Sequence, residues 1–245
     1  MMKDNKIFLS VTAPAYNEEA SIEAVIREWE DVLKKYDYTA EIVICNDGST
    51  DRTGEILDGL MKEFPNVRAV HSSQNGGYGD ALFNAIYASR GEYVVTIDSD
   101  GQFELSDVEL LLKECVEKKL DAVTGYRTRK NDTYMRFLAD RVLNIIVKTL
   151  FGLGFRDTNC ALKLFKGGLI RGTLNEARFY PTPTEIIIRL HEQKARISEV
   201  GVRHYKRKGG QSHLKFVRTS IDMFLFLLYM RFRLHLERSS VINVS

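Results

Sequence analysis

The feature of this sequence that most constrains its fold is a regular alternation of short β-branched runs with longer segments whose apolar residues recur at helical spacing. Strands separated by helices of this length need right-handed crossovers, which build a mainly parallel sheet covered by helices on both faces. We therefore predict an α/β protein with a Rossmann-like sheet. The predicted strands cover residues 7–12, 41–45, 67–71, 93–97 and 121–125, and the predicted helices cover 21–35, 53–64, 80–89 and 106–118.

Beyond residue 127 the alternation becomes looser. The whole pattern predicts one domain over residues 1–213, followed by a C-terminal helix and tail over residues 214–245. The later elements are expected to be a helix over 134–151, a short strand over 162–165, a strand-to-helix element over 181–193, a strand over 197–205 and a long last helix over 214–236.

The last predicted helix is amphipathic, with apolar side chains near one stripe and cations beside it. Such a helix can lie in the headgroup layer of a membrane, pack on the sheet, or contact a second subunit in a homo-oligomer. The apolar residues of the stripe are Phe216, Ile221, Phe224, Leu225, Leu228 and Phe232, and the cations are Lys215, Arg218, Arg231, Arg233 and Arg238.

Composition narrows the class of partner. The chain has 35 lysines and arginines against 33 acidic residues, a net charge of +2, which gives no bulk attraction for nucleic acid. Three widely spaced cysteines match neither a zinc ribbon nor a disulfide framework, and they favour a reducing cytoplasm. The sequence has no run of about 20 apolar residues, the length of a membrane-spanning helix, and no hydrophobic leader at its amino terminus. Contact with a membrane is therefore expected to be peripheral.

Polar segments follow each of the first four predicted strands. A single segment of this kind is commonly a turn or a helix cap. Because the carboxyl ends of parallel strands meet at one edge, where open α/β sheets bind their ligands, the four together predict a binding site. The segments are Pro14-Ala15-Tyr16-Asn17-Glu18, Asn46-Asp47-Gly48-Ser49-Thr50-Asp51, Asn75-Gly76-Gly77-Tyr78-Gly79 and Asp98-Ser99-Asp100-Gly101-Gln102.

The fourth segment carries the clearest chemistry. Asp98 and Asp100 are two residues apart, so in extended backbone their carboxylates project to one side. Gly101 lets the chain turn away without placing a side chain in the site. Two carboxylates with the amide oxygen of Gln102 suit a hard cation such as Mg²⁺ or Mn²⁺, which would stabilise a departing diphosphate. The alternative is a pair of solvated acids at the start of a loop.

Two glycine-containing segments need separate interpretation. The glycines at 76, 77 and 79 follow the third strand and lack the dinucleotide-binding spacing, which argues against an NAD site. The sequence contains no P-loop motif, which excludes a P-loop nucleotide triphosphatase. The segment from Arg207 to His213 combines cations with a glycine pair. It is either a phosphate-binding loop, with Arg207 and Ser212 as donors, or a solvated basic loop.

The four strand-end segments, in this order and spacing, resemble those of family 2 glycosyltransferases, which have the GT-A fold. Later segments resemble those of dolichyl- and polyprenyl-phosphate sugar synthases such as dolichol-phosphate mannose synthase, and the resemblance reaches about residue 213. These segments are Gly125-Tyr126-Arg127, Arg136 to Asn144, Asp157 to Lys163, Thr184-Glu185, Glu199 to Val202, and Arg207-x-x-Gly210-x-Ser212.

The resemblance implies an inverting enzyme that moves one hexose from a GDP- or UDP-sugar to a polyprenyl phosphate, with Mg²⁺ or Mn²⁺ as cofactor. It implies that Asp98 and Asp100 act with Arg127 and Arg136 as the catalytic set, the two arginines binding the acceptor phosphate. Asp98, Asp100 and Gln102 would hold the metal. The other residues assigned to the donor are Pro14, Tyr16, Glu18, Asp47, Ser99, Arg207, Ser212 and His213.

The acceptor decides which further residues the reaction needs. A phosphate monoester is anionic near neutral pH, since its second pKa is about 6, and it needs no protein base. A sugar hydroxyl would need a carboxylate as general base, and Asp157 and Glu185 are the candidates. Asp140 and His213 depart from the family pattern and leave a third interpretation, an inactive partner that binds nucleotide sugar. We favour the phosphate acceptor, used at the cytoplasmic face of a membrane.

Overall fold

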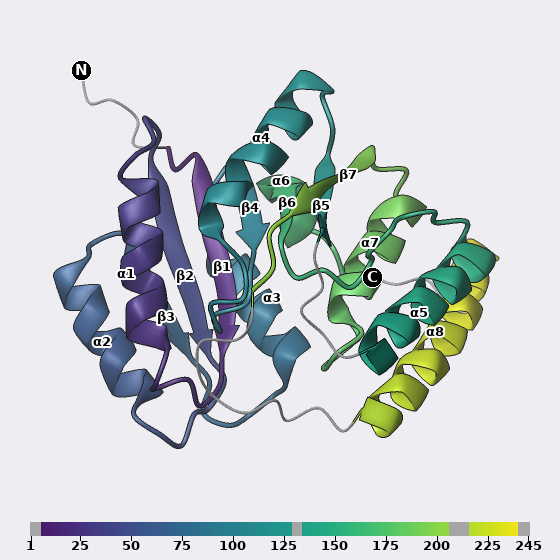
Figure 1. Cartoon of the computed structure of the whole chain (residues 1–245), viewed down its shortest axis with the longest axis horizontal. Coiled ribbons are helices and arrows are strands. Elements are labelled where there is room, and N and C mark those ends of the chain that lie inside the picture. Colours follow the sequence, from purple (N-terminus) through teal and green to yellow (C-terminus); the bar gives the residue numbers. More distant parts are fainter. Residues whose placement is uncertain (1–5, 129–133, 206–215, 240–245) are drawn as a thin grey trace.

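A central sheet of seven strands organises the computed structural model, which describes residues 6–128, 134–205 and 216–239, with the backbone alone at 134–138 and 216–218. The strands lie in the order β3-β2-β1-β4-β6-β5-β7 (Figure 1). β6 runs antiparallel to both neighbours and all other pairs are parallel, which confirms the predicted mainly parallel α/β sheet. The strands are β1 (Leu9–Ala15), β2 (Ala40–Asn46), β3 (Val67–His71), β4 (Tyr93–Thr96), β5 (Ala122–Arg127), β6 (Lys163–Lys166) and β7 (Ile197–Val202).

Helices connect these strands at nearly the predicted positions. Arg52 occupies the N-cap position of the second helix without a side-chain capping bond, and Asp51 before it accepts a hydrogen bond from the Thr53 backbone N–H. The helices are α1 (Ile22–Leu33), α2 (Thr53–Glu63), α3 (Tyr78–Ala88), η1 (Leu105–Asp107), α4 (Val108–Glu117), α5 (Tyr134–Phe151), α6 (Gly167–Arg171), α7 (Thr182–Glu192) and α8 (Phe216–Arg238).

Three local features differ from the predicted pattern. The segment 181–193 does not begin as a strand: α7 is helical from Thr182 and carries Pro183 in its first turn, where the missing N–H of proline costs nothing. The five-residue helix α6 has no periodic signal of its own and was not predicted. Ser106, at the start of the predicted helix over 106–118, lies inside the 3₁₀ turn η1, and α4 begins only at Val108.

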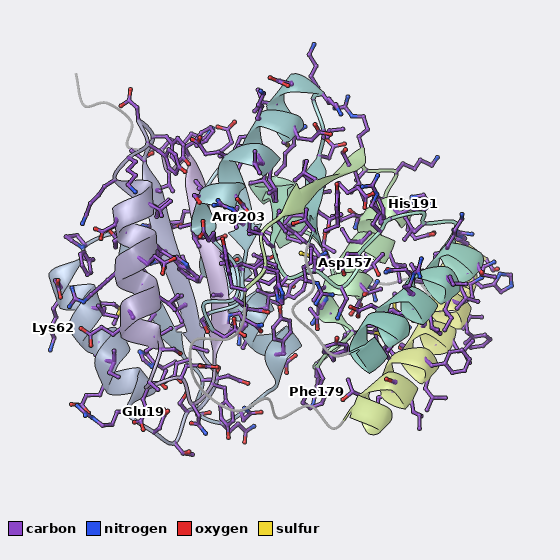
Figure 2. The ribbon with its side chains drawn as sticks, in the orientation of Figure 1. Glu19, Lys62, Asp157, Phe179, His191 and Arg203 are labelled. Atoms are coloured by element: carbon purple, nitrogen blue, oxygen red, sulfur yellow. The ribbon has the colours of Figure 1, made fainter. Side chains whose placement is uncertain are left out.

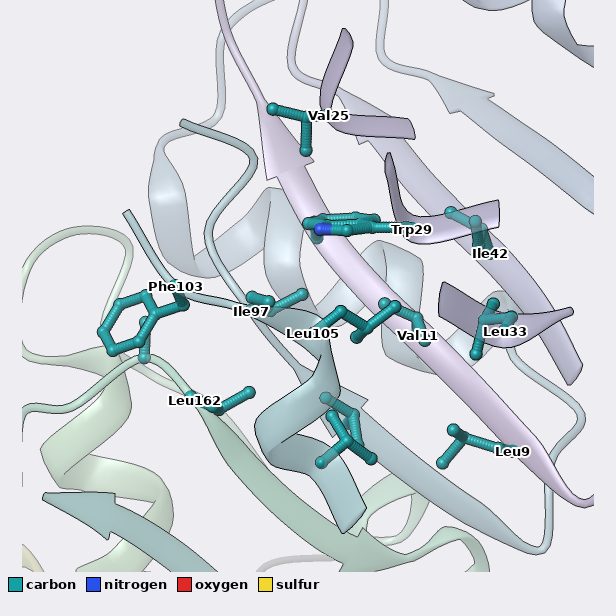
Figure 3. Close-up of a cluster of buried hydrophobic side chains, with 14 of the residues drawn as sticks. Leu9, Val11, Val25, Trp29, Leu33, Ile42, Ile97, Phe103, Leu105 and Leu162 are labelled. Atoms are coloured by element: carbon teal, nitrogen blue, oxygen red, sulfur yellow. The ribbon is translucent and has the colours of Figure 1, made fainter. Parts of the chain in front are cut away.

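Two layers of helices cover the sheet. On one face α1, α2 and α4 bury a core in which the indole of Trp29, 1% exposed, lies against side chains of β1 and β2 (Figure 3). Leu9 and Val11 are two residues apart on β1, so both side chains point to the same face of the sheet and into this core. On the opposite face Leu82 and Ile86 of α3 pack against β4, β5, β6 and α7.

α5 and α8 lie side by side at one end of the molecule (Figure 1). One stripe of α8, formed by Met223, Leu227, Met230 and Leu234, is buried against α5 and α7. The predicted apolar stripe of this helix lies elsewhere, and its described members Ile221, Phe224, Leu225, Leu228 and Phe232 are exposed. α8 is therefore apolar on two sides and buries only one of them. Among the described residues, no helix is both long and apolar enough to cross a membrane.

The buried carboxylate of Glu41, in β2, holds β1 and the segment between α3 and β4 at the end of the sheet opposite to the polar segments. It accepts hydrogen bonds from the Ser10 hydroxyl at 2.7 Å, the Arg90 backbone N–H at 2.6 Å and the Arg90 guanidinium at 2.8 Å. Burial alone would raise the pKa of Glu41, but these hydrogen bonds outweigh it and hold the pKa below the ordinary value. A carboxylate whose folded-state pKa is lowered stabilises the fold above its unfolded-state pKa, and the stabilisation is lost as pH falls through the folded-state pKa.

We predict that Glu41→Gln lowers the free energy of unfolding at pH 7 by about 1–3 kcal/mol, the range for a hydrogen-bonded charged group. Urea unfolding followed by circular dichroism from pH 7 to pH 3 should show a steeper loss of stability for the wild type than for the variant. Glu92→Gln, at an exposed ion pair with Lys6, is the control and should change stability by less than about 0.5 kcal/mol. Equal pH slopes for wild type and Glu41→Gln would contradict this assignment.

Candidate active site

The carboxyl ends of β1 and β2 are tied together at one edge of the sheet. Ala15 and Asn46 are paired at the last register position, and the Asp47 N–H donates to the Ala15 carbonyl at 2.9 Å. Asn17 has a positive φ of 54° and its side chain accepts the Thr50 N–H at 2.8 Å. These contacts give the two loops one fixed shape.

The donor-binding residues predicted in the first loop all lie at this edge. Tyr16 is 38% exposed, as a ring that stacks on a ligand needs to be. Glu18 is buried and accepts the Ser21 hydroxyl at 2.8 Å. The Pro14 carbonyl accepts the hydroxyl of Ser99 at 2.7 Å, which links the end of β1 to the segment after β4.

Asp47 holds the glycine-rich loop after β3. Its two carboxylate oxygens accept the N–H groups of Gly76 at 2.8 Å and Gly77 at 2.9 Å. Gly77 has a φ of +97°, and a Cβ there would lie 2.5 Å from the Arg178 carbonyl oxygen, so the position requires glycine. The sequence predicts Asp47 as a nucleoside ligand, and the structure shows that it also shapes the loop that leads into α3.

Asp98 and Asp100 lie at the end of β4, where the sequence places them. The Tyr78 hydroxyl donates to Asp98 Oδ1 at 3.0 Å, and the Gln102 N–H donates to Asp100 Oδ1 at 3.0 Å. Burial and the nearby charge of Asp98 raise the pKa of Tyr78 well above its ordinary value, so the hydroxyl stays a donor. Tyr78 is a site residue that sequence reasoning missed, although it stands inside the third polar segment.

The residues at the end of β4 fit a divalent cation of the Mg²⁺ class. Such ions bind through one or two carboxylates and complete their shell with substrate phosphates and water. Asp98 and Asp100 would supply the two carboxylates, and Gly101, with a φ of +72°, turns the chain away after them. The described residues contain no group of three or more His, Cys, Asp or Glu that could hold a metal by themselves. The side-chain amide nitrogen of Gln102 donates to the Tyr205 backbone carbonyl at 3.1 Å. This hydrogen bond fixes the Gln102 side chain and therefore the position of its own amide oxygen.

Arg127 ends β5 at the same edge and is held by two carboxylates. Its Nε donates to Asp157 at 2.7 Å and its Nη2 to Asp157 at 3.1 Å and to Asp140 at 3.0 Å. The side chain is 12% exposed. Burial opposes the charge, but both carboxylates raise the pKa of Arg127, which therefore stays protonated. Asp140, the departure from the family pattern, is thus part of the arginine's support.

A buried lysine lies on β6, between β4, which is followed by Asp98 and Asp100, and β5, which ends at Arg127. Lys163, at the start of β6, donates to the Thr124 hydroxyl at 2.8 Å and the Thr158 carbonyl at 3.0 Å. Burial lowers the pKa of Lys163 to about 8, while the charges of Asp157 and Asp98 act in the opposite direction.

The two acids that sequence reasoning offers as general bases are both engaged in structural contacts. Asp157 is 2% exposed and forms the bidentate pair with Arg127. Glu185 is fully buried and accepts the Ala177 N–H at 2.7 Å, the Glu176 N–H at 3.0 Å and the Arg189 Nε at 2.6 Å. Each therefore acts as an acceptor that fixes neighbouring groups.

Four predicted site residues lie wholly or partly outside the described residues. Arg136 falls in α5, where only the backbone is described. Arg207, Ser212 and His213 lie in the segment 206–215, which the structure does not describe. Their predicted roles stay predictions.

The comparisons with known proteins agree with this architecture. The family model for glycosyl transferase family 2 matches residues 10–174. The chain belongs to glycosyl transferase family 2. The predicted class of enzyme, a glycosyltransferase, is thereby confirmed, and the matched residues include the described residues predicted to bind the donor, the metal and the acceptor phosphate.

Curated relatives of this family 2 glycosyltransferase include lipid-phosphate enzymes. A dolichyl-phosphate beta-glucosyltransferase of Dictyostelium discoideum is 30% identical over 94% of this chain and 75% of the relative. Another of that name from Trichomonas vaginalis is 34% identical over 65% of this chain and 53% of the relative, so the chain spans only about half of that protein's length.

A solved structure shows the same fold. Glucosyl-3-phosphoglycerate synthase from Mycobacterium tuberculosis, crystallised with Mn²⁺, UDP-glucose and phosphoglyceric acid, superposes with a TM-score of 0.71 at 21% identity, over 92% of this chain and 80% of that one. This likeness and the strand order confirm the predicted GT-A fold.

We predict that Asp157→Asn destabilises the enzyme by about 3–5 kcal/mol, because it leaves the buried guanidinium of Arg127 with one fewer charged partner. Asp140 accepts fewer of the described hydrogen bonds of Arg127 than Asp157 does, so Asp140→Asn should cost less and serves as the comparison. Thermal and urea unfolding of the three proteins measures the difference. Equal stability of Asp157→Asn and the wild type would show that the pair with Arg127 does not support the site.

Proposed function

We propose that this enzyme transfers one hexose from a UDP- or GDP-sugar to a polyprenyl phosphate, with inversion at the anomeric carbon and with a divalent cation. The observation that carries the proposal is the engagement of both candidate bases, Asp157 and Glu185, in buried structural contacts. An acceptor that is already an anion needs no such base, whereas a sugar hydroxyl does. The lipid-phosphate enzymes among the relatives support the same acceptor.

The donor would lie along the carboxyl edge of β1, β2 and β4. The nucleoside would contact Tyr16 and the loop that Asp47 holds, and the diphosphate would lie by Asp98 and Asp100. A cation held by the two carboxylates with the Gln102 carbonyl oxygen would neutralise the negative charge that accumulates on the departing diphosphate. Because hydrogen bonds hold these loops in place before the ligand arrives, binding requires little further loss of backbone entropy.

The acceptor phosphate would approach from the side of Arg127 and Arg136. The carboxylates of Asp157 and Asp140 orient the guanidinium of Arg127. Arg136 is in the first turn of α5, the next helix after β5 along the chain. Attack of a phosphate oxygen on the anomeric carbon, opposite the leaving diphosphate, is a single displacement and therefore inverts the configuration. The protein's part is to align the nucleophile and to stabilise the leaving group.

A lipid acceptor also requires contact with a membrane surface. α8 exposes Ile221, Phe224, Leu225, Leu228 and Phe232, with exposed fractions from 43% to 62%. α5, beside it, exposes Val142 and Ile145, and Lys148 and Arg231 are exposed cations on these two helices. An apolar surface flanked by cations fits the headgroup layer of anionic lipids. We therefore propose peripheral binding at the cytoplasmic face through α5 and α8.

The function is tested by incubating purified enzyme with a panel of UDP- and GDP-sugars, short polyprenyl phosphates and Mg²⁺ or Mn²⁺, with lipid products detected by mass spectrometry. We predict that Asp100→Ala lowers turnover by at least about 10³-fold, since it removes stabilisation of the leaving group. Chelation by EDTA should abolish transfer, and added cation should restore it. The control is Asp31→Ala, at an exposed ion pair on α1. Near-wild-type turnover by Asp100→Ala would overturn the proposed role of the β4 carboxylates.

Membrane contact is tested by flotation with vesicles of phosphatidylglycerol or of phosphatidylcholine alone. We predict that Leu225→Glu with Phe232→Glu reduces the bound fraction at least tenfold on anionic vesicles, because two charges would enter the headgroup layer in place of apolar side chains. Val116→Glu, on the exposed side of α4, is the matched control and should bind as the wild type does. If the double variant floats normally, or if light scattering shows that this face joins two copies, the assignment to lipid is wrong.

A further inference from the structure

Phe179, in the segment between α6 and α7, is as exposed as any large apolar side chain that the structure describes. Its side chain is 64% exposed, the same fraction as Ile145 on α5. Figure 2 labels it at the same edge of the molecule as Glu19, the residue that follows the β1 loop. A single exposed phenylalanine is ordinary on a protein surface. This one differs because its backbone is fixed and because of where its ring lies.

The backbone on both sides of Phe179 is held by buried groups. Upstream, the Glu185 carboxylate accepts the N–H groups of Glu176 and Ala177. Downstream, the Phe179 carbonyl accepts the Thr182 hydroxyl at 2.8 Å and the Thr182 N–H at 3.2 Å. The exposed ring is therefore carried on a preorganised segment, which lowers the entropy cost of using it for binding.

The ring of Phe179 lies against the glycine-rich loop of the donor site. A Cβ placed on Gly77 would come within 2.8 Å of the ring, and the Gly79 N–H donates to the Arg178 carbonyl at 2.8 Å. Gly77 binds Asp47 on one side and precedes Tyr78, whose hydroxyl contacts Asp98. Phe179 therefore lies at the border of the candidate active site, which we call its rim.

The next residue points toward the layer that carries the exposed apolar helices. Tyr180 packs against the core shared by α5, α7 and α8. Burial raises the pKa of Tyr180 to about 12, and the charges of Asp140 and Arg127 act on its hydroxyl. Consecutive Cα atoms are about 3.8 Å apart. Residues 179 and 180 thus connect the donor loop, the arginine cluster and the helices proposed to contact lipid.

We propose that the ring of Phe179 binds the first isoprene units of the acceptor, next to its phosphate. This inference rests on the proposed function, because it presupposes a polyprenyl phosphate. The phosphate must lie beside the reaction edge while the hydrocarbon chain returns to the bilayer, so the units nearest the phosphate have to cross the rim outside the lipid. A fixed, exposed aromatic side chain at that rim covers apolar units that would otherwise be in water.

The test measures KM for both substrates in detergent solution, with citronellyl phosphate and a longer polyprenyl phosphate as acceptors. Phe179→Ala should raise KM for both acceptors by about tenfold or more, the scale expected for losing a buried phenylalanine contact. KM for the nucleotide sugar should change less than twofold. Phe179→Leu should recover most of the acceptor affinity, because it restores apolar area without a ring.

Leu174→Ala is the matched control. Leu174 is 49% exposed in the same segment. It lies away from the site, because the carbonyl of its neighbour Thr173 accepts a hydrogen bond from the hydroxyl of Tyr87, at the end of α3 that is far from the site. Unfolding midpoints confirm that the exposed substitutions leave the fold intact.

Three outcomes would decide against the inference. If the wild type transfers sugar to prenyl phosphates and Phe179→Ala keeps the wild-type acceptor KM, the inference fails and the proposed function stands. If KM for the donor rises and KM for the acceptor does not, the ring contacts the sugar nucleotide instead. If the wild type transfers no sugar to any prenyl phosphate, the proposed function fails and the inference with it.

Discussion

The candidate site depends on the parallel register of β1 with β2 and β4. Ala15 faces Asn46 in one pair and Thr12 faces Thr96 in the other, so the three chains leave the sheet at the same edge. A slip of one residue would turn each apolar side chain of β1 to the wrong face and displace each strand-end segment. The alternation that buries Leu9 and Val11 beneath α1 therefore also places the loops that are proposed to bind the donor. Core and site share one determinant.

That determinant explains how much could be predicted from the sequence. The alternation of β-branched and helical segments predicts the strands, and the polar segments after them predict a site at the carboxyl ends of the strands. Both predictions depend only on local spacing. The partners of Arg127 could not be predicted, since Asp140 and Asp157 stand 13 and 30 residues away and meet it only in the folded chain. The hydrogen bonds of Asp47 to the glycine loop were equally hidden, because they depend on the positive φ of Gly77.

The direction of β6 is the clearest example of information that a local pattern lacks. Its apolar run predicts a strand, but periodicity is the same for parallel and antiparallel pairing. Running antiparallel places Lys163, the first residue of β6, at the reaction edge rather than the far one. The buried ammonium then ties Thr124 in the middle of β5 to Thr158 beside Asp157. A reversed strand thus supplies a cation that holds the arginine side of the site.

The last helix is connected to the donor edge by a continuous set of contacts. Tyr229 and Arg233 of α8 both contact Glu176, and Arg189 of α7 joins Glu176 to Glu185. Glu185 holds the backbone at 176–177, and the Arg178 carbonyl accepts the N–H of Gly79 in the glycine-rich loop. The Arg189–Glu185 pair is buried and costly to leave half-made, whereas the contacts of Glu176 with α8 are partly exposed. The surface proposed to meet the lipid and the loop proposed to hold the donor are therefore connected through a buried ion pair and the backbone that it holds.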